Sequence, residues 1–129
     1  MSELSTVVKR GLSGLGLFAR TDLPKDTFII EYWGEPITPE EAERRGGKYL
    51  FTVSDTCVID GKIRSNTARY INHSCQPNAY AEADEEEERI RVYAKRLIKA
   101  GEEITYHYGK EYFQIMLQGH CRCPACSRT

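Results

Sequence analysis

The sequence predicts a mainly β protein with short helices. Short runs rich in β-branched and aromatic residues recur along the chain, and such runs are typical of strands in small sheets. Only one segment carries a strong helix start. At 129 residues the chain is expected to form one domain, large enough for a real hydrophobic core but too small for two. The expected strands are residues 7–9, 17–19, 27–33, 49–53, 57–59, 79–83, 89–94 and 104–106.

The first expected helix follows the strand at 27–33. Thr38 can cap it, Pro39 suits the first helical position, and Glu41 completes a capping box. Two consecutive glycines, Gly46 and Gly47, should end it. Two further short helices are expected, one over residues 67–71 and one over residues 111–117.

Two turns are expected in the second half of the chain. The acidic run 84–88 separates two strand-like segments, which predicts a solvated hairpin loop with at most a secondary role in attracting basic peptides. Residues 101–103 should form a turn into the last strand. Propensity alone does not give the order of the strands in the sheets.

Composition argues against several classes of function, and a nucleic-acid-binding zinc module remains only a weak third possibility. A net charge of −1, with 29% charged residues, lacks the basic stripe of a nucleic-acid-binding zinc module. No apolar run approaches the length of a membrane span, and the polar, acidic start does not resemble a signal peptide. Three of the five cysteines lie in the last nine residues, which favours a thiolate metal site in a reducing, intracellular compartment over a disulfide scaffold.

Three phrases carry the functional signal. They are RYINHSCQPN at residues 69–78, GEEITYHYG at 101–109 and CRCPAC at 121–126. In this order they resemble the SET domain, a family of protein-lysine methyltransferases that use S-adenosylmethionine. The resemblance runs from about residue 7 to 126. It implies several small sheets around a C-terminal pseudoknot, with residues 1–109 as the SET domain and 110–129 as a post-SET-like zinc tail in one structural unit.

The resemblance implies a cofactor site built from separate segments. Gly14, Leu15 and Gly16 match a Gly-x-Gly loop whose main chain contacts S-adenosylmethionine, although the pair of glycines taken alone is better explained by a plain hairpin turn. The loop is not a Rossmann fingerprint, because the third glycine and a long helix are missing. Asn72 and His73 match the pair that contacts the cofactor; outside this phrase they would be a turn residue and a satisfied core histidine.

Two further residues belong to the expected cofactor site. Arg69 matches an arginine that supports the Asn-His segment. Phe113, with Tyr112 before it, matches aromatic residues that pack on the adenine, although an amphipathic helix face explains both equally well.

The resemblance also implies a lysine channel lined by Tyr32, Tyr106 and Tyr108. Tyr108 matches the catalytic tyrosine, and Tyr106 matches a Phe/Tyr switch position, where tyrosine favours monomethylation. The alternative is a set of buried strand tyrosines, since the chain has eight. For Trp33, next to Tyr32, packing in the core is the preferred interpretation.

The cysteines predict a zinc site. Zinc takes four tetrahedral thiolate or imidazole ligands, and Cys75, Cys121, Cys123 and Cys126 match the four cysteines of the family's post-SET site. His120 is an alternative ligand, and a redox pair or unliganded thiols is an alternative interpretation. Cys57, on an expected strand, should be a buried thiol.

Three departures from the family pattern concern single positions or spacing. Ser65 and His107 replace a usual Gly and Asp, and two residues rather than four separate Cys123 from Cys126. The shortened spacing alters the expected zinc geometry.

These features predict a protein-lysine N-methyltransferase that acts on a histone or other basic protein tail, mainly monomethylates, and releases S-adenosylhomocysteine. The alternative is a non-catalytic SET-like module that binds a peptide. No direct binding to nucleic acid or membrane is expected, and the chain would be a monomer or homodimer. The expected location is nuclear in a eukaryote and cytoplasmic in a microbe.

Overall fold

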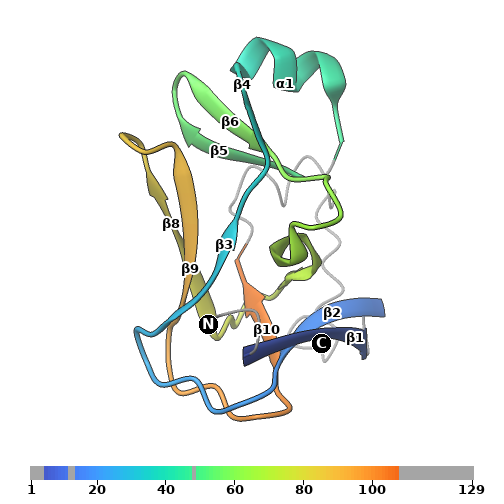
Figure 1. The fold of residues 1–129 in the computed structure, drawn as a ribbon, viewed down its shortest axis with the longest axis vertical. Coiled ribbons are helices and arrows are strands. Elements are labelled where there is room, and N and C mark those ends of the chain that lie inside the picture. The colour runs from blue at the N-terminus through green and yellow to red at the C-terminus, as the bar shows by residue number, and fades with distance from the viewer. Residues whose placement is uncertain (1–4, 12–13, 48, 108–129) are drawn as a thin grey trace.

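The computed structural model describes residues 5–11, 14–47 and 49–107 (Figure 1). Nearly half of these residues lie in short strands and few lie in helices, which confirms the predicted mainly β class. The expected helix at 111–117, Tyr108, Phe113 and the cysteines at 121, 123 and 126 lie outside the described residues, as does the C-terminal segment of the expected pseudoknot.

Ten strands form three small sheets among the described residues. One sheet has the order β1-β2-β10-β7, the second β3-β9-β8 and the third β4-β6-β5. The strands are β1 (Thr6–Gly11), β2 (Gly14–Ala19), β3 (Phe28–Tyr32), β4 (Glu35–Ile37), β5 (Leu50–Ser54), β6 (Cys57–Asp60), β7 (Asn72–His73), β8 (Ala79–Asp84), β9 (Arg89–Ala94) and β10 (Glu103–Tyr106). The eight predicted strands are all present, whereas β4 and β7 were not predicted.

The helix α1 (Pro39–Arg45) begins and ends where its sequence signals predict. The Thr38 hydroxyl accepts a hydrogen bond from the Glu41 N–H at 3.1 Å, and Gly46 ends the helix with a φ of 63°. The Glu41 carboxylate accepts from Arg45 Nε at 2.7 Å, so its charge supports the last turn of the helix. The second predicted helix is also present, as the 3₁₀ helix η2 (Thr67–Tyr70).

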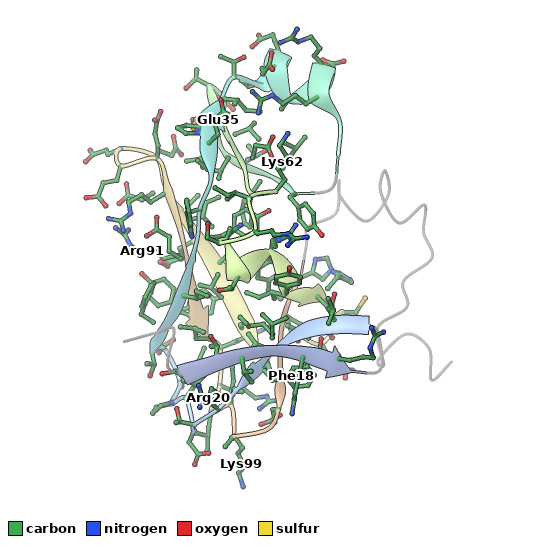
Figure 2. All side chains as sticks on the ribbon, turned by 45° about the vertical axis from the view of Figure 1, so that its right-hand side comes forward. Phe18, Arg20, Glu35, Lys62, Arg91 and Lys99 are labelled. Carbon is green, nitrogen blue, oxygen red and sulfur yellow. The ribbon has the colours of Figure 1, made fainter. Side chains whose placement is uncertain are left out.

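The sheets are arranged along the long axis of the molecule. Figure 1 shows α1 and the β4-β6-β5 sheet at the top, the β1–β2 hairpin near the bottom, and η2 between them. Buried side chains from all three sheets share one core, in which the largest fully buried aliphatic residues are Leu17, Ile29, Ile71, Ile90, Val92, Ile98 and Ile104. Lys62 and Lys99 are exposed, and Lys99 lies at the lower end of the molecule (Figure 2).

The acidic run forms the turn between β8 and β9, as predicted. The Asp84 carboxylate accepts from the Glu87 N–H at 3.1 Å, and this bond is the main reason that the pKa of Asp84 is lowered. Arg91 pairs with both Asp84 and Glu87, so the loop's charge is partly neutralised by its own hairpin.

Candidate functional site

A parallel pairing of β7 with β10 brings two of the sequence phrases together. Asn72 pairs with Thr105 and His73 pairs with Tyr106. The Ser74 N–H continues the contact by donating to the Tyr106 carbonyl at 3.0 Å. Residues more than thirty positions apart in the chain therefore share one backbone ladder.

Asn72 connects this ladder to the glycine loop. Its Nδ2 donates to the Leu15 carbonyl at 3.0 Å and to Glu103 Oε2 at 2.8 Å. The predicted cofactor residues Leu15 and Asn72 thus lie side by side, and Glu103 joins them. The sequence did not single out Glu103, since a glutamate after a glycine turn is an ordinary solvent-exposed residue.

Gly16 packs tightly against the same group. A Cβ on Gly16 would lie 2.4 Å from Glu103 Oε2 and 3.2 Å from Asn72 Nδ2. Gly14 has a φ of 95°, which favours glycine for a different reason, its backbone conformation. Leu15 between them is 48% exposed. A carbonyl, an amide and a carboxylate therefore meet beside an exposed loop, and these donors and acceptors suit the amino-acid end of a ligand.

His73 is buried beside two other potential metal ligands. Its Nε2 lies 3.5 Å from Cys75 Sγ, and its ring centroid lies 4.6 Å from that of His107, with the planes at 72°. One donor atom from each of the three residues lies within 4.8 Å of the other two. Burial, and secondarily the neighbouring His107, lowers the pKa of His73, which favours the neutral imidazole.

An aromatic cluster contains two of the three predicted channel residues. Tyr32 and Tyr106 are 4% and 5% exposed, and both pack against Phe51, at ring-centroid distances of 5.2 and 6.3 Å. The Tyr32 hydroxyl donates to the Tyr49 carbonyl at 2.7 Å. Such apolar, aromatic surroundings disfavour a charged amine and favour its neutral form.

The SET domain profile matches residues 14–109, which is most of the chain. The chain belongs to the SET-domain family. It is 40% identical over 124 residues to histone-lysine N-methyltransferase 2D from Homo sapiens, covering 88% of this chain and 2% of that protein. It is 38% identical over 125 residues to histone-lysine N-methyltransferase set1 from Dictyostelium discoideum, covering 88% of this chain and 8% of the relative.

The name of a third relative states a position on the histone. It is the histone-lysine N-methyltransferase, H3 lysine-4 specific, of Chaetomium globosum, 43% identical over 104 residues, covering 72% of this chain and 10% of the relative. This SET domain therefore spans at most about a tenth of the length of these three proteins. Among the described residues, no helix is both long and apolar enough to cross a membrane.

Arg69 of the SET domain is held by neighbouring protein groups. Its guanidinium lies 5.1 Å from the Tyr49 ring centroid and 4.7 Å from that of Tyr70. It donates to the Lys62 carbonyl at 3.2 Å and to the Tyr70 hydroxyl at 2.8 Å. Through these contacts Arg69 stabilises the short helix η2, which ends shortly before Asn72.

The core packing predicted for Trp33 is wrong. Its side chain is 39% exposed, whereas Tyr32 before it is buried. Successive side chains of an extended segment point to opposite sides, so Tyr32 takes the inward position. The backbone N–H of Trp33 donates to Asn66 Oδ1 at 3.2 Å. Cys57 is the buried thiol that was predicted, and burial is the first cause of its raised pKa.

Asn66 and Asn78 are two buried amides whose structural roles the sequence did not indicate. Asn66 is fully buried and donates from Nδ2 to the Gly61 carbonyl at 3.0 Å, beside Tyr32. Asn78 bridges the backbone of β10, donating to the Glu103 carbonyl at 2.8 Å and accepting from the Thr105 N–H at 2.9 Å. Neither residue lies in a periodic pattern that would mark it as buried.

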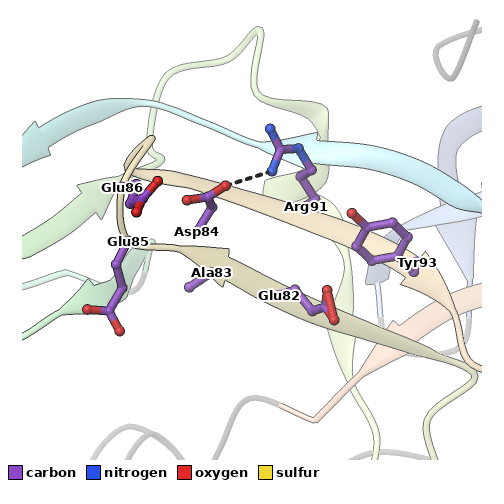
Figure 3. A pocket seen from close by; sticks show the side chains of 7 residues that line it. All are labelled: Glu82, Ala83, Asp84, Glu85, Glu86, Arg91 and Tyr93. Carbon is purple, nitrogen blue, oxygen red and sulfur yellow. Dashed lines mark hydrogen bonds and ion pairs between the residues drawn. The ribbon is translucent and has the colours of Figure 1, made fainter.

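A hollow over the β8–β9 hairpin contains none of the predicted site residues (Figure 3). One of its carboxylates, Asp84, is paired with Arg91. It is lined by Glu82, Ala83, Asp84, Glu85, Glu86, Arg91 and Tyr93. The predicted site residues that the structure describes lie instead around Asn72 and Tyr106.

Proposed function

We propose that this SET domain transfers a methyl group from S-adenosylmethionine to a lysine side chain of a histone or similar basic protein tail. The supporting observation is that one strand, β10, joins both halves of the site. Glu103 at its start contacts Asn72, and Tyr106 at its end belongs to the aromatic cluster. Three residues of extended chain span about 10 Å, so the two halves of the proposed site lie on one short strand.

The cofactor is proposed to lie against the glycine loop. Gly14, Leu15 and Gly16 would offer main-chain groups, and Asn72 and His73 would hold the amino-acid end. Arg69 would support this segment through its contacts around η2. Phe113 is proposed to cover the adenine. The space beside Gly16 is filled by the Glu103 carboxylate and the Asn72 amide, which hold the loop against the Asn72 segment.

The channel is proposed to deliver an uncharged amine. A lysine with a free pKa of about 10.4 costs roughly 4–5 kcal/mol to deprotonate at pH 7. Buried aromatic walls around Tyr32 and Tyr106 lower that cost, because they disfavour the ammonium form. The lysine ammonium would first lose one proton to solvent. The neutral nitrogen would then bond to the methyl carbon as the carbon–sulfur bond breaks, which leaves a methylated ammonium and S-adenosylhomocysteine.

Tyr108 and Tyr106 are proposed to have separate roles in the methyl transfer. Tyr108 would align the amine, which is the main catalytic need once the proton is gone. The Tyr106 hydroxyl would occupy, with a bound water, the space that a second methyl group needs. We therefore propose mainly monomethylation. The cluster of Tyr106 with Phe51 and Tyr32 supports a narrow channel.

Zinc is proposed to hold the C-terminal tail, residues 110–129, beside the SET domain at 1–109. Cys75 would share the ion with Cys121, Cys123 and Cys126. Cys75 is exposed, directly after the buried Ser74, so its thiolate could share a metal ion with ligands from another segment. A zinc site of this kind would complete the channel and supply folding free energy. The substrate class places the activity in the nucleus or on chromatin in a eukaryote.

The deciding experiment measures methyl transfer by the purified chain from labelled S-adenosylmethionine. A histone H3 peptide containing lysine 4 is the first substrate, because the Chaetomium relative carries that specificity in its name. The full set of core histones follows. Tyr108→Phe should reduce turnover by at least a hundredfold and leave cofactor affinity, measured by calorimetry, within a few-fold.

Tyr93→Phe is the matched control, since Tyr93 stacks on Tyr80 on the β8–β9 hairpin, outside the site. It should retain full turnover. Binding of the peptide without any transfer by the unaltered chain would instead identify a non-catalytic peptide-binding module. Equal loss of cofactor binding and turnover in Tyr108→Phe would show that Tyr108 has a different role.

A further inference from the structure

We propose that Asn66 is a positioning residue for methyl transfer, because its buried amide fixes the ring of Tyr32 in the proposed lysine channel. Asn66 lies directly before the helix η2, which packs against β3. Its side chain is fully buried. The inference rests on the proposed function and deepens it, since it names a residue that acts on the lysine through Tyr32.

The Asn66 amide joins two segments that are distant in the sequence. Its Oδ1 accepts from the backbone N–H of Trp33 at 3.2 Å, and its Nδ2 donates to the Gly61 carbonyl at 3.0 Å. Trp33 directly follows Tyr32 at the end of β3, and Gly61 directly follows β6. Because a buried amide needs partners for both its oxygen and its nitrogen, these bonds hold the side chain in one orientation. Asn66 therefore connects the end of β3 to the end of β6.

The Gly61 backbone lies against the Tyr32 ring. A Cβ on Gly61 would lie 2.5 Å from Tyr32 Cε1 and 2.6 Å from Asn66 Nδ2. The Gly61 N–H donates to the Tyr49 carbonyl at 2.8 Å, and the Tyr32 hydroxyl donates to the same carbonyl at 2.7 Å. The ring is therefore held along its edge by Gly61 and at its hydroxyl by Tyr49. A change in the position of Gly61 must move the ring, the shared carbonyl or both.

Movement of Tyr32 would reach the other channel residues. The Tyr32 ring packs against Phe51, and Phe51 packs against Tyr106. Alignment of the amine is sensitive to such shifts, because a displacement of about 1 Å can cost about a hundredfold in rate. The proposed cofactor site lies on other strands, with the glycine loop on β2 and Asn72 on β7. Loss of the Asn66 amide should therefore impair use of the lysine substrate and spare binding of the cofactor.

The test measures the lysine substrate and the cofactor separately in full-length Asn66→Ala. With the histone H3 peptide containing lysine 4, kcat/KM should fall about tenfold or more relative to the unaltered chain. The dissociation constant of S-adenosylmethionine, measured by calorimetry, should stay within about twofold, because the cofactor site is distant from the substitution. A residue with only a structural role would not produce this split, since a less stable fold loses both properties together.

Ile98→Ala is the control for lost stability. Ile98 is fully buried beside its bridge partner Leu23, outside the proposed site. Both variants should lower the midpoint of urea unfolding. Assayed without urea, Ile98→Ala should keep the kcat/KM and the cofactor affinity of the unaltered chain. Full activity of Asn66→Ala would overturn the inference, and so would a parallel loss of its cofactor affinity.

If Asn66→Ala does not fold, ¹⁵N spectra of the unaltered chain decide the question. The peptide should then shift the signals of the Asn66 side-chain amide and the Trp33 backbone N–H, whereas a peptide with alanine in place of the lysine should shift neither. Unshifted signals, or equal shifts from both peptides, overturn the inference. A chain that transfers no methyl group to any histone overturns the proposed function and the inference together, whereas the contrary results above overturn the inference alone.

Discussion

Asn78→Ala tests whether a buried amide positions the strand that carries the proposed active site. Asn78 is 4% exposed. Its side chain donates to the Glu103 carbonyl at 2.8 Å and accepts from the Thr105 N–H at 2.9 Å. Alanine would remove both bonds and leave two backbone groups of β10 without these partners.

The magnitude follows from what the two backbone groups lose. A buried polar group deprived of its partner costs about 1–3 kcal/mol. Two such groups would cost about 2–6 kcal/mol together. Both bonds are only partly buried, so water can partly replace the amide. The loss of unfolding free energy should therefore fall in the lower half of that range, about 2–4 kcal/mol. That is a large share of a typical unfolding free energy of about 5–15 kcal/mol. Because β10 also carries Tyr106, methyl transfer should fall as well.

Urea unfolding of the two proteins, followed by circular dichroism, measures the difference in free energy of unfolding. Gln76→Ala is the matched control, since it removes an exposed amide two residues away and should cost within about 0.5 kcal/mol. A loss below 1 kcal/mol for Asn78→Ala would refute the argument that the two backbone bonds position β10.

Three further predictions concern single substitutions. Gly61→Ala should destabilise the fold by about 1–3 kcal/mol in urea unfolding, because its Cβ would lie 2.5 Å from Tyr32 Cε1; an unchanged midpoint would contradict this. The hydrogen bond from Arg96 is the first cause that lowers the pKa of Glu102 below 4.5. The stabilisation that this hydrogen bond provides is therefore present above that pH and is lost as the pH falls. Glu102→Gln should accordingly be less stable at pH 7, with a difference that shrinks below pH 4.5. Tyr106→Phe should increase dimethyllysine by mass spectrometry, whereas mainly trimethyllysine from the unaltered chain would exclude the proposed switch.

Local signals predicted most of the fold. The cap at Thr38 and the glycine at 46 fix α1 within the chain itself, so sequence alone was sufficient for that helix. The strands β4 and β7 were missed because they have three and two residues, too few for an alternating pattern to be recognisable. Their existence depends on partners distant in sequence, β6 for β4 and β10 for β7.

Contacts between residues distant in sequence also limited what could be predicted of the site. Gly14, Leu15, Asn72 and Tyr106 were predicted as site residues because their phrases resemble a family, not because spacing places them together. The parallel pairing of β7 and β10 places Asn72 and Tyr106 at neighbouring positions. Glu103 was missed because its role depends on contact with Asn72, which no local pattern encodes.

His107 shows how this structure extends what the sequence indicates. In the sequence it is only a departure from the family phrase at one position between two tyrosines. In the fold, the ladder that aligns His73 with Tyr106 also places the His107 ring against His73 and near Cys75. Strand register rather than sequence distance therefore determines which side chains meet.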